Sequence, residues 1–348
     1  MNLDSVIDSL LSPIADKISG IIFSSVTIHG VKVEFLVVLL MFAALYFTFR
    51  TRFIGFWGFK HAIKLITKNY EHKDIVHRKK HGEVSAFQAL TATISASAGI
   101  GNVAGSAAAV SIGGPGVIFW MMVAGVFSMA LKFAEVLLGL KFRNINEDGS
   151  VDGGPMYYIL KGLKNHKIVG PFAPFLAKSY AVCCIFAMIG GWNLFQINAM
   201  TTQITEVTGG EASFFHNQSW CLGLIVAVIT YVTIIGGIKA IGKFTSKVTP
   251  VMCSLYVLSA FIICVMHIGH LPHTVHIILT EAFKPKALQG GAFACMLWGF
   301  RRAMFANEAG LGTAPIAFSA VRTNKPVAQA FIAMLQPFVD TVIVGSAT

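Results

Sequence analysis

Residues 84–131 contain no charged residue, and the middle of this stretch is crowded with glycine, alanine and serine. One crossing of a bilayer needs roughly 20 apolar residues, so the stretch is long enough to cross a membrane twice. The run Gly113-Gly114-Pro115-Gly116 is the natural place for the chain to turn between the two crossings. The sequence therefore predicts a pair of membrane-spanning helices here.

Glycines interrupt the first of these crossings at Gly99-Ile100-Gly101-Asn102. A break in mid-membrane frees backbone N–H and C=O groups, and it survives only where it lines a cavity or is buried in protein. Secondary transporters build substrate and ion sites from breaks of this kind. We therefore expect residues 98–102 to be non-helical and to face a central cavity. The same glycines allow an alternative, because Gly101 and Gly105 have the small-xxx-small spacing of a helix-packing face.

The composition indicates a polytopic membrane protein. Only 12% of the residues are charged, against roughly 25% in soluble domains, while 55% are hydrophobic and the mean hydropathy is +0.69. The net charge of +11 does not indicate a nucleic-acid partner, because the basic residues lie between hydrophobic spans, as the positive-inside rule describes. The six cysteines show no paired metal-ligand spacing, and we expect no cofactor. No paired acid and base or nucleophile constellation recurs in the spans, so we do not expect an enzyme.

The charge pattern also predicts the order of segments. We expect an extracytoplasmic segment at residues 1–30, either an amphipathic helix or a loose tail, followed by a transmembrane helix at 31–50, whose apolar run extends back from Phe35 to Val31. A basic loop at 51–83 follows, and its lysines and arginines place it in the cytoplasm and the N-terminus outside the cell membrane. Later spans include an uncharged one from Ser179 to Thr205 and one from Val248 to Ile268 after a lysine-bearing loop.

A second broken helix is expected in the segment 287–321. This segment begins as an apolar run and then meets Arg301 and Arg302, which would be expensive in lipid and should face protein or water. We place the break near Trp298–Phe300, opposite the first break; the glycine-rich residues 309–312 are the alternative position.

Several polar side chains in apolar surroundings have two interpretations each. Asp340 is a lone carboxylate in the final apolar span, and it is either a cation or proton ligand or a partner of the arginine pair. Gln196 and Asn198 either line a substrate pocket or make interhelical hydrogen bonds. Lys132 and Glu135 lie one helical turn apart near the inner end of a crossing, and we expect a local ion pair with a snorkelling lysine rather than a role in transport.

Two stretches, SASAGIGNVAGSAAAVSIGGPGVIFWM at 95–121 and GFRRAMFANEAGLGTAPIA at 299–317, strongly resemble the alanine/glycine:cation symporter family. The resemblance covers nearly the whole chain at the level of span order. It implies an all-α polytopic membrane protein with a leucine-transporter-like inverted repeat and one extra N-terminal helix. Residues 84–268 would be the first five-helix repeat, and 287–348 the first two helices of an incomplete second repeat. We therefore expect a C-terminally truncated member that cannot drive sodium-coupled uptake alone.

The breaks and the resemblance together predict a binding site. The free backbone amides near Gly101, at the positive end of a half-helix, would bind a substrate carboxylate, and nearby carbonyls would face its amino group or a hard cation. Trp298 or Phe300 would limit the size of the pocket. The expected substrate-binding residues are Ser97, Ile100, Gly101, Asn102, Gln196, Trp298, Gly299 and Phe300. The expected sodium ligands are Ser95, Ala98 and Asp340.

The leading interpretation is a secondary active symporter that imports small neutral amino acids, alanine or glycine, coupled to sodium or protons by alternating access. Its expected partners are the amino acid, sodium as the coupling ion, and the lipid bilayer of the cell membrane. One alternative is an ion channel, which would need a continuous polar pore. Another is a partial membrane protein that does not transport. One methyl group changes pocket affinity by only roughly 1 to 3 kcal/mol, so alanine, glycine and their D-forms all stay open.

Overall fold

The computed structural model describes residues 3–28, 31–67, 82–99, 101–284 and 290–348. The described chain is mostly helical, but it also contains two antiparallel two-stranded sheets, in which β1 (Ser25–Ile28) pairs with β2 (Val31–Glu34) and β3 (Asn144–Ile145) with β4 (Val151–Asp152). The first half of the chain contains α1 (Leu3–Ile22), α2 (Phe35–Arg50), α3 (Ile54–Trp57), α4 (Phe59–Thr67), α5 (Ala86–Ser97), α6 (Val103–Gly113), α7 (Gly116–Phe142) and α8 (Pro155–Leu163). The helical class is confirmed, and the expectation of helices alone is wrong for the two hairpins.

The remaining helices form three groups. The first contains η1 (Gly170–Phe172), α9 (Ala173–Ala187), η2 (Met188–Leu194), α10 (Phe195–Val207), η3 (Gly210–Ala212) and α11 (Phe214–Asn217). The second contains α12 (Ser219–Ile234), α13 (Gly237–Met266), η4 (Ile268–His270) and α14 (Leu271–Phe283). The third contains α15 (Gly291–Asn307), α16 (Thr313–Ser319), α17 (Pro326–Ala333), α18 (Leu335–Pro337), η5 (Phe338–Val344) and α19 (Gly345–Ala347).

Among the described residues, four helical stretches are long and apolar enough to cross a membrane: 116–142, 170–207, 237–266 and 326–347. A fifth is added if the bent pair formed by α2 and by α3 with α4, which meet at 67°, is one span. The broken pair α5 and α6 has 12 and 11 residues, which at roughly 1.5 Å per residue together cover the hydrocarbon core of about 30 Å. Several apolar helices, intact and broken, therefore fit the expected multi-pass membrane protein.

Two predicted boundaries are wrong. The first span does not extend back to Val31, because 31–34 is the strand β2, in which Val31 and Val33 are buried and Lys32 is exposed, the alternation typical of a half-buried strand. The lysines expected in a loop before Val248 lie instead within α13, which runs unbroken from Gly237. Lysine is a good helix former, so basic residues at the membrane surface need not end a helix.

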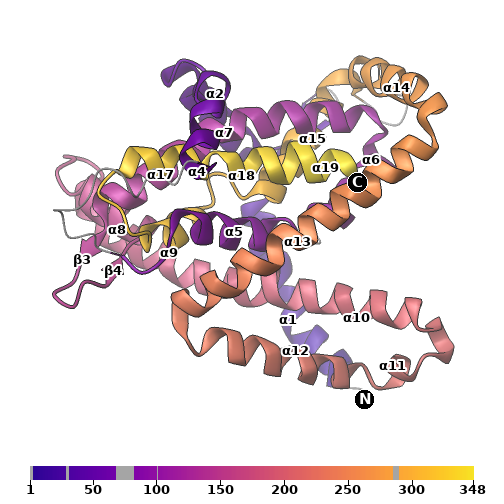
Figure 1. The fold of residues 1–348 in the computed structure, drawn as a ribbon, viewed down its shortest axis with the longest axis horizontal. Helices are drawn as coiled ribbons and strands as arrows, with labels where there is room; N and C mark the ends of the chain where they lie inside the picture. The colour runs from indigo at the N-terminus through magenta and orange to yellow at the C-terminus, as the bar shows by residue number, and fades with distance from the viewer. Residues whose placement is uncertain (1–2, 29–30, 68–81, 100, 285–289) are drawn as a thin grey trace.

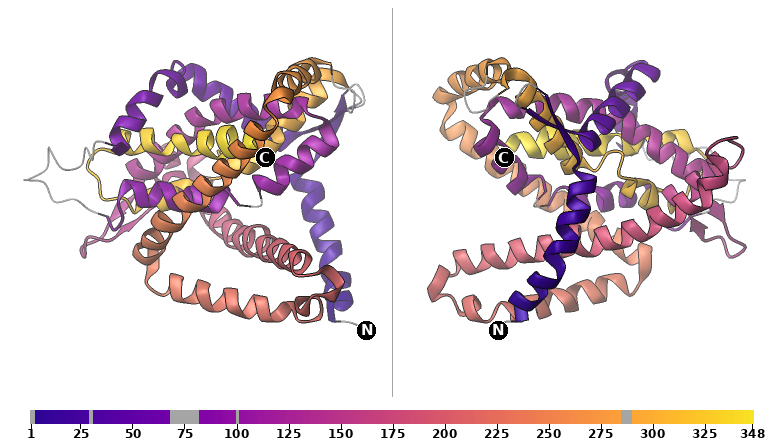
Figure 2. Two further views of the ribbon diagram at one scale, coloured as in Figure 1. Left: turned by 45° about the vertical axis from the view of Figure 1, so that its right-hand side comes forward. Right: turned by 180° about the vertical axis from the view of Figure 1, so that it is seen from behind.

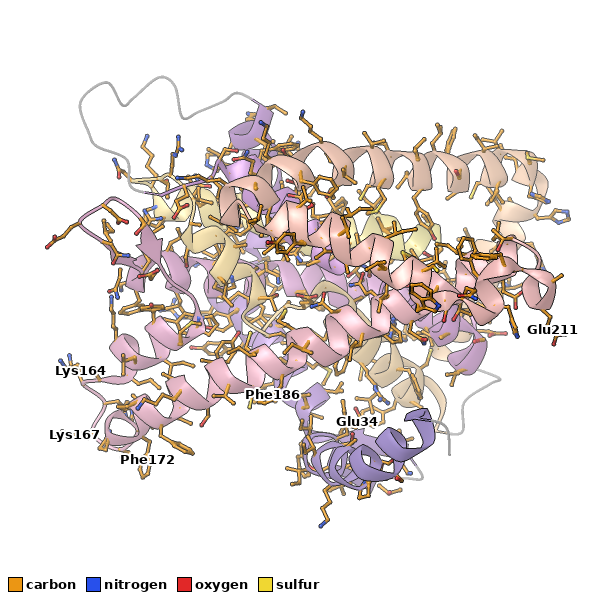
Figure 3. All side chains as sticks on the ribbon, turned by 90° about the horizontal axis from the view of Figure 1, so that it is seen from below. Glu34, Lys164, Lys167, Phe172, Phe186 and Glu211 are labelled. Carbon is orange, nitrogen blue, oxygen red and sulfur yellow. The ribbon has the colours of Figure 1, made fainter. Side chains whose placement is uncertain are left out.

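The third long span, from η1 through α9 and η2 to α10, separates charge by its length. Figure 3 shows Lys164 and Lys167 near one end of this span and Glu211 near the other, with Phe186 on the outer side between them. Phe186 is 70% exposed, which suits a lipid-facing position. The middle of the span, η2, is a π-helix, an element frequently found at functional sites.

α7 is the central helix of the packed body. It contacts α2, α14, α15, α16 and α17, and in Figure 1 it runs alongside the α17–α19 segment. Its glycine neighbour Gly299, on α15, lies so close to Trp120 that a Cβ atom there would overlap the Trp120 side chain. The helices α10, α11 and α12 lie apart from this body, and α13 passes from them to α5 (Figures 1 and 2). The most buried part of the chain therefore surrounds the two helix breaks.

Candidate functional site

The first break lies where the sequence predicts it. α5 ends at Ser97 and α6 begins at Val103, and the described residues between them, 98, 99, 101 and 102, are in turns. The expectation of a non-helical segment is therefore confirmed there, whereas Ile100 lies outside the described residues. Asn102 is 0% exposed, and its side-chain N–H donates to the Ser97 carbonyl oxygen over 2.8 Å. This hydrogen bond ties the start of α6 back to the end of α5.

The second break does not lie near Trp298–Phe300, where we predicted it. α15 continues unbroken to Asn307, and the break spans Glu308 to Gly312, the alternative position. Three residues there have positive φ angles: Glu308, Gly310 and Gly312. The helix continues through Gly299 because that glycine allows α15 to pack closely on α7 at Trp120. Phe300 is buried in the same packed cluster, and Trp298 stacks against Arg301 at 5.2 Å, so both have packing roles in this structure.

A buried ion pair from α7 holds the second break. Lys132 and Glu135 lie 3.0 Å apart and are 0% and 5% exposed, which confirms the predicted pair but not the snorkelling. The Lys132 ammonium donates to the Glu308 carbonyl oxygen over 3.2 Å. The Gly310 N–H donates to the Glu135 carboxylate over 3.0 Å.

One side chain connects the two breaks. The amide N–H groups of Gln336, on α18, lie 3.1 Å from the Ser97 hydroxyl and 3.4 Å from the Asn307 carbonyl oxygen. The Asn307 side chain in turn donates to the Thr341 hydroxyl over 3.2 Å. The last residues of α5 and α15 are therefore held together by polar side chains from a third segment.

Asp340 lies in the π-helix η5, and its carboxylate is hydrogen-bonded to the Ser97 hydroxyl. Asn102, Gln336 and Asp340 thus all meet at Ser97, and all are nearly or fully buried. One oxygen of each, Asn102 Oδ1, Gln336 Oε1 and Asp340 Oδ1, has no hydrogen-bond partner among the residues that the structure describes. Buried oxygens of this kind normally have a partner, and oxygen ligands are what hard cations prefer.

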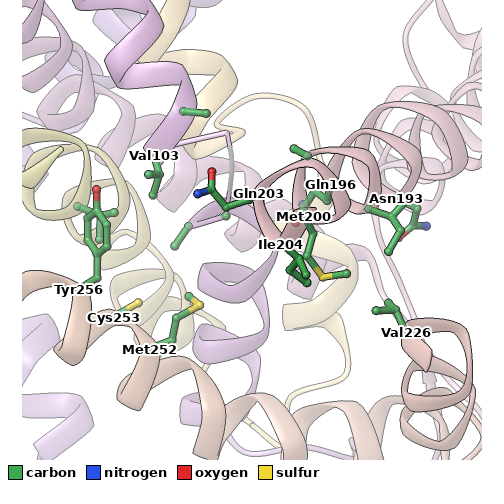
Figure 4. A pocket seen from close by; sticks show the side chains of 16 residues that line it. Val103, Asn193, Gln196, Met200, Gln203, Ile204, Val226, Met252, Cys253 and Tyr256 are labelled. Atoms are coloured by element: carbon green, nitrogen blue, oxygen red, sulfur yellow. The ribbon is translucent and has the colours of Figure 1, made fainter. Parts of the chain in front are cut away.

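A cavity of about 780 Å³ adjoins the first break on its other side (Figure 4). Ala98 and Gly99 line it, as do Val103 and Ala104 at the start of α6. The opposite wall comes from η2, α10, α12, α13 and η5, and it includes Asn193, Gln196, Gln203, Met252 and Tyr256. A pocket of this size is typical of small-molecule sites. Gln196 lies directly over Gly99: a Cβ atom on that glycine would be 2.9 Å from the Gln196 amide oxygen.

The arginine pair does not reach Asp340. Arg301 forms an ion pair with Glu34 at 2.9 Å. Arg302 donates to the Gly101 carbonyl oxygen, and its guanidinium occupies the space that a side chain on Gly105 would fill. The alternative in which Asp340 is the partner of these arginines is therefore wrong, and the alternative in which Gly105 serves close packing is confirmed.

The structure brings some of the predicted site residues together and leaves others apart. Ser97, Asn102 and Asp340 meet, Gly101 accepts a hydrogen bond at the first break, and Ala98 and Gln196 line the cavity. Ser95 is half-buried on α5 and does not line the cavity, and Asn198 is exposed. Trp298, Gly299 and Phe300 lie outside the cavity lining.

Sequence reasoning missed Gln336, Asn307 and Thr341. A usable signal existed for Gln336, which precedes Asp340 by four residues in an apolar run, so that both side chains lie on one helix face. Asn307 gave no comparable signal, because it precedes a glutamate and looked like part of a polar loop.

Comparison with known proteins agrees with this architecture. Residues 19–348 match the sodium:alanine symporter family. The sodium/alanine symporter AgcS of Methanococcus maripaludis is 36% identical over 90% of this chain and 66% of its own length. The probable sodium/glutamine symporter GlnT and the amino-acid carrier protein AlsT, both of Bacillus subtilis, are each 30% identical over 90% of this chain. These two alignments cover 62% and 63% of the relatives, so the chain spans about two thirds of the length of the curated relatives it matches. With two broken helices, a buried polar cluster between them and this match over nearly its whole length, the chain belongs to the sodium:alanine symporter family.

Proposed function

We propose that this protein takes part in sodium-coupled symport of a small neutral amino acid, alanine or glycine, across the cell membrane. The observation that carries the proposal is the meeting of both helix breaks at one buried polar cluster beside a cavity. The name of AgcS, a sodium/alanine symporter, supports the choice of ion and substrate.

The proposed cation site is the cluster at Ser97. Asp340 supplies a carboxylate, while Asn102 and Gln336 supply amide oxygens, and the oxygen of each that lacks a described partner is available to a cation. Glu308 and Lys132 are close enough to Asp340 to interact with it electrostatically, so the surroundings contain more carboxyl groups than amines. A sodium ion there would compensate buried negative charge that is otherwise unfavourable in the membrane.

The proposed amino-acid site lies at the first break, on the side that faces the cavity. Backbone groups of residues 98–102 would bind the zwitterion, and Gln196 would contact it from the opposite wall. Because Ser97 and Ala98 are adjacent, a cation at the Ser97 cluster would hold the break in the shape that binds the amino acid. Such linkage is reciprocal, so alanine would raise the affinity for sodium by the same factor.

The test is uptake of labelled alanine into vesicles that contain the purified protein. We expect accumulation driven by an inward sodium gradient, and none when potassium replaces sodium. Unlabelled glycine and D-alanine should compete, and glutamine provides a larger neutral competitor. Uptake driven by a proton gradient without sodium would assign the coupling to protons. Equal uptake in sodium and potassium, or flux that neither saturates nor accumulates, would contradict symport.

A further inference from the structure

The ion pair Lys132–Glu135 lies far in sequence from the break that it contacts. The hydrogen bonds join residues 176 and 175 positions apart, Lys132 to Glu308 and Glu135 to Gly310. Both charged side chains are buried at mid-length in α7. A buried ion pair is seldom a source of net stability, because desolvation opposes the Coulomb attraction. Its position therefore calls for a role other than stability alone.

The two charges match the unwound backbone in polarity. An ammonium can only donate, and it faces a carbonyl oxygen at Glu308; a carboxylate can only accept, and it faces an N–H at Gly310. The carboxylate also interacts with the backbone of Gly312, the last residue of the break. The pair thus satisfies backbone groups that lost their helical partners where α15 ends.

Further contacts fix the same segment from other sides. Tyr180 of α9 donates to the Leu311 carbonyl oxygen over 3.0 Å, and Thr313 donates to the Glu308 carboxylate over 2.6 Å. Asn307, which precedes the break, accepts the Ala309 N–H on its side-chain oxygen over 3.0 Å. Asn307 also reaches Thr341 and Gln336 of the proposed cation site. The shape of the break therefore determines where Asn307 stands in that site.

We propose that Lys132 and Glu135 are positioning residues, which hold the unwound segment Glu308–Gly312 in the shape that places Asn307 and Gln336 at the proposed cation and substrate site. The inference rests on the proposed function for the identity of the ligands. The pair acts through directional hydrogen bonds to the break, and mutual neutralisation of two buried charges is not sufficient for this role.

Two matched neutral variants separate direction from charge. The double variant Lys132→Gln/Glu135→Gln removes both charges but keeps a donor at one position and an acceptor at the other. The double variant Lys132→Met/Glu135→Leu has similar volume and offers neither. We expect the glutamine variant to bind alanine in sodium within about threefold of the unaltered protein, and the Met/Leu variant at least roughly tenfold more weakly, as expected for losing hydrogen bonds to buried backbone groups.

A charge-swapped variant, Lys132→Glu/Glu135→Lys, provides the opposite control. It keeps the two charges paired but places an acceptor against the Glu308 carbonyl and a donor against the Gly310 N–H. We expect alanine binding at least roughly tenfold weaker than in the unaltered protein. Native-like binding by this variant would overturn the proposal, as would equal affinities in the two neutral variants.

Amide hydrogen exchange of residues 308–312 makes the result independent of the ligand. We expect faster exchange in the Met/Leu variant and unchanged exchange in the glutamine variant. If the unaltered protein does not bind alanine, the proposed function is wrong, but exchange still decides whether the pair holds the break. Equal exchange in both neutral variants, or failure of both to fold, would refute positioning through hydrogen bonds.

Discussion

At the scale of single residues, the candidate site depends on the hydroxyl and carbonyl of one serine. Ser97 contacts Asp340 and Gln336 through its hydroxyl and Asn102 through its backbone oxygen. A serine hydroxyl has only one proton to donate, and the Thr93 carbonyl lies 3.0 Å from the same oxygen. The proton is therefore shared among competing acceptors, which leaves capacity on the Asp340 carboxylate for a cation.

Replacing Asp340 with Asn tests this interpretation. The amide has the same shape but no negative charge, so we expect the sodium concentration needed for half-maximal alanine binding to rise at least roughly tenfold. We expect the unfolding temperature to be unchanged or higher, because an isolated buried carboxylate is costly. Calorimetric titration and thermal unfolding measure the two effects. The same substitution at Asp148, an exposed residue between β3 and β4, is the control.

Asn102 provides a second test at this scale. In Asn102→Ala the hydrogen bond to the Ser97 carbonyl is lost along with a buried oxygen. We expect weaker binding of alanine and sodium and a free energy of unfolding lower by about 1 to 3 kcal/mol. Ser111→Ala removes a polar side chain from the exposed face of the same helix and should change neither. Titrations indistinguishable from those of the unaltered protein would leave Asn102 with a packing role only.

At the scale of elements, each broken helix depends on where glycine lets a neighbour approach. Gly105 in α6 leaves the space that the Arg302 guanidinium of α15 occupies, and that guanidinium donates to Gly101 in the first break. The glycine thus acts on the shape of the break through a side chain from another helix. An arginine partway along α15 is acceptable in a membrane because protein backbone receives its hydrogen bond.

Gly105→Ala should displace Arg302, because the new methyl group would coincide with the guanidinium. We expect destabilisation by about 1 to 3 kcal/mol, the usual cost of overpacking, and weaker alanine binding. The control is Gly223→Ala in α12, where an added Cβ meets nothing within 4 Å. Alanine is the better helix former, so this control should be neutral or stabilise by roughly 0.5 to 1 kcal/mol. Thermal unfolding of both variants measures the contrast, and equal effects would argue against the Arg302 contact.

At the scale of the whole molecule, the far ends of the two broken helices are fastened together. Val84, just before α5, forms a parallel bridge with Val321, just after α16. Arg143, at the end of α7, donates to the carbonyl oxygens of Ser319, Val321 and Thr323 over 2.7 to 2.9 Å. Burial lowers the pKa of the Arg143 guanidinium, but arginine stays charged in proteins at neutral pH. Alternating access would require one end of the site to open, and this fastening is the contact to release at its end.

A disulfide between cysteines at 84 and 321 should therefore stop transport without abolishing binding. Neighbouring β segments lie roughly 4.8 Å apart, within the Cα separation that a disulfide accepts. In Val84→Cys/Val321→Cys we expect sodium-driven alanine uptake to be lost on oxidation and restored by reduction, while alanine still binds in detergent. The two single-cysteine variants are the controls. Uptake by the cross-linked protein would show that this end does not open.

Local sequence patterns were sufficient for some elements and failed for others. The first break could be predicted because its glycines interrupt an uncharged run, and the membrane spans could be predicted from their length and apolar character. The second break could not be placed, because Gly299 and Gly310 look equally able to break a helix. Their difference lies in their neighbours: Gly299 packs against Trp120, whereas Gly310 donates its N–H to Glu135.

The sequence by itself determined that the chain enters a membrane, where its first helix breaks, and which family it resembles, because hydrophobicity and backbone freedom are properties of neighbouring residues. Only the tertiary structure decided which polar groups meet. Ser97 and Asp340 are 243 positions apart, and Lys132 reaches Glu308 across 176. Such pairs form because buried polar groups must find partners wherever the packed helices place them, and no local pattern records that placement.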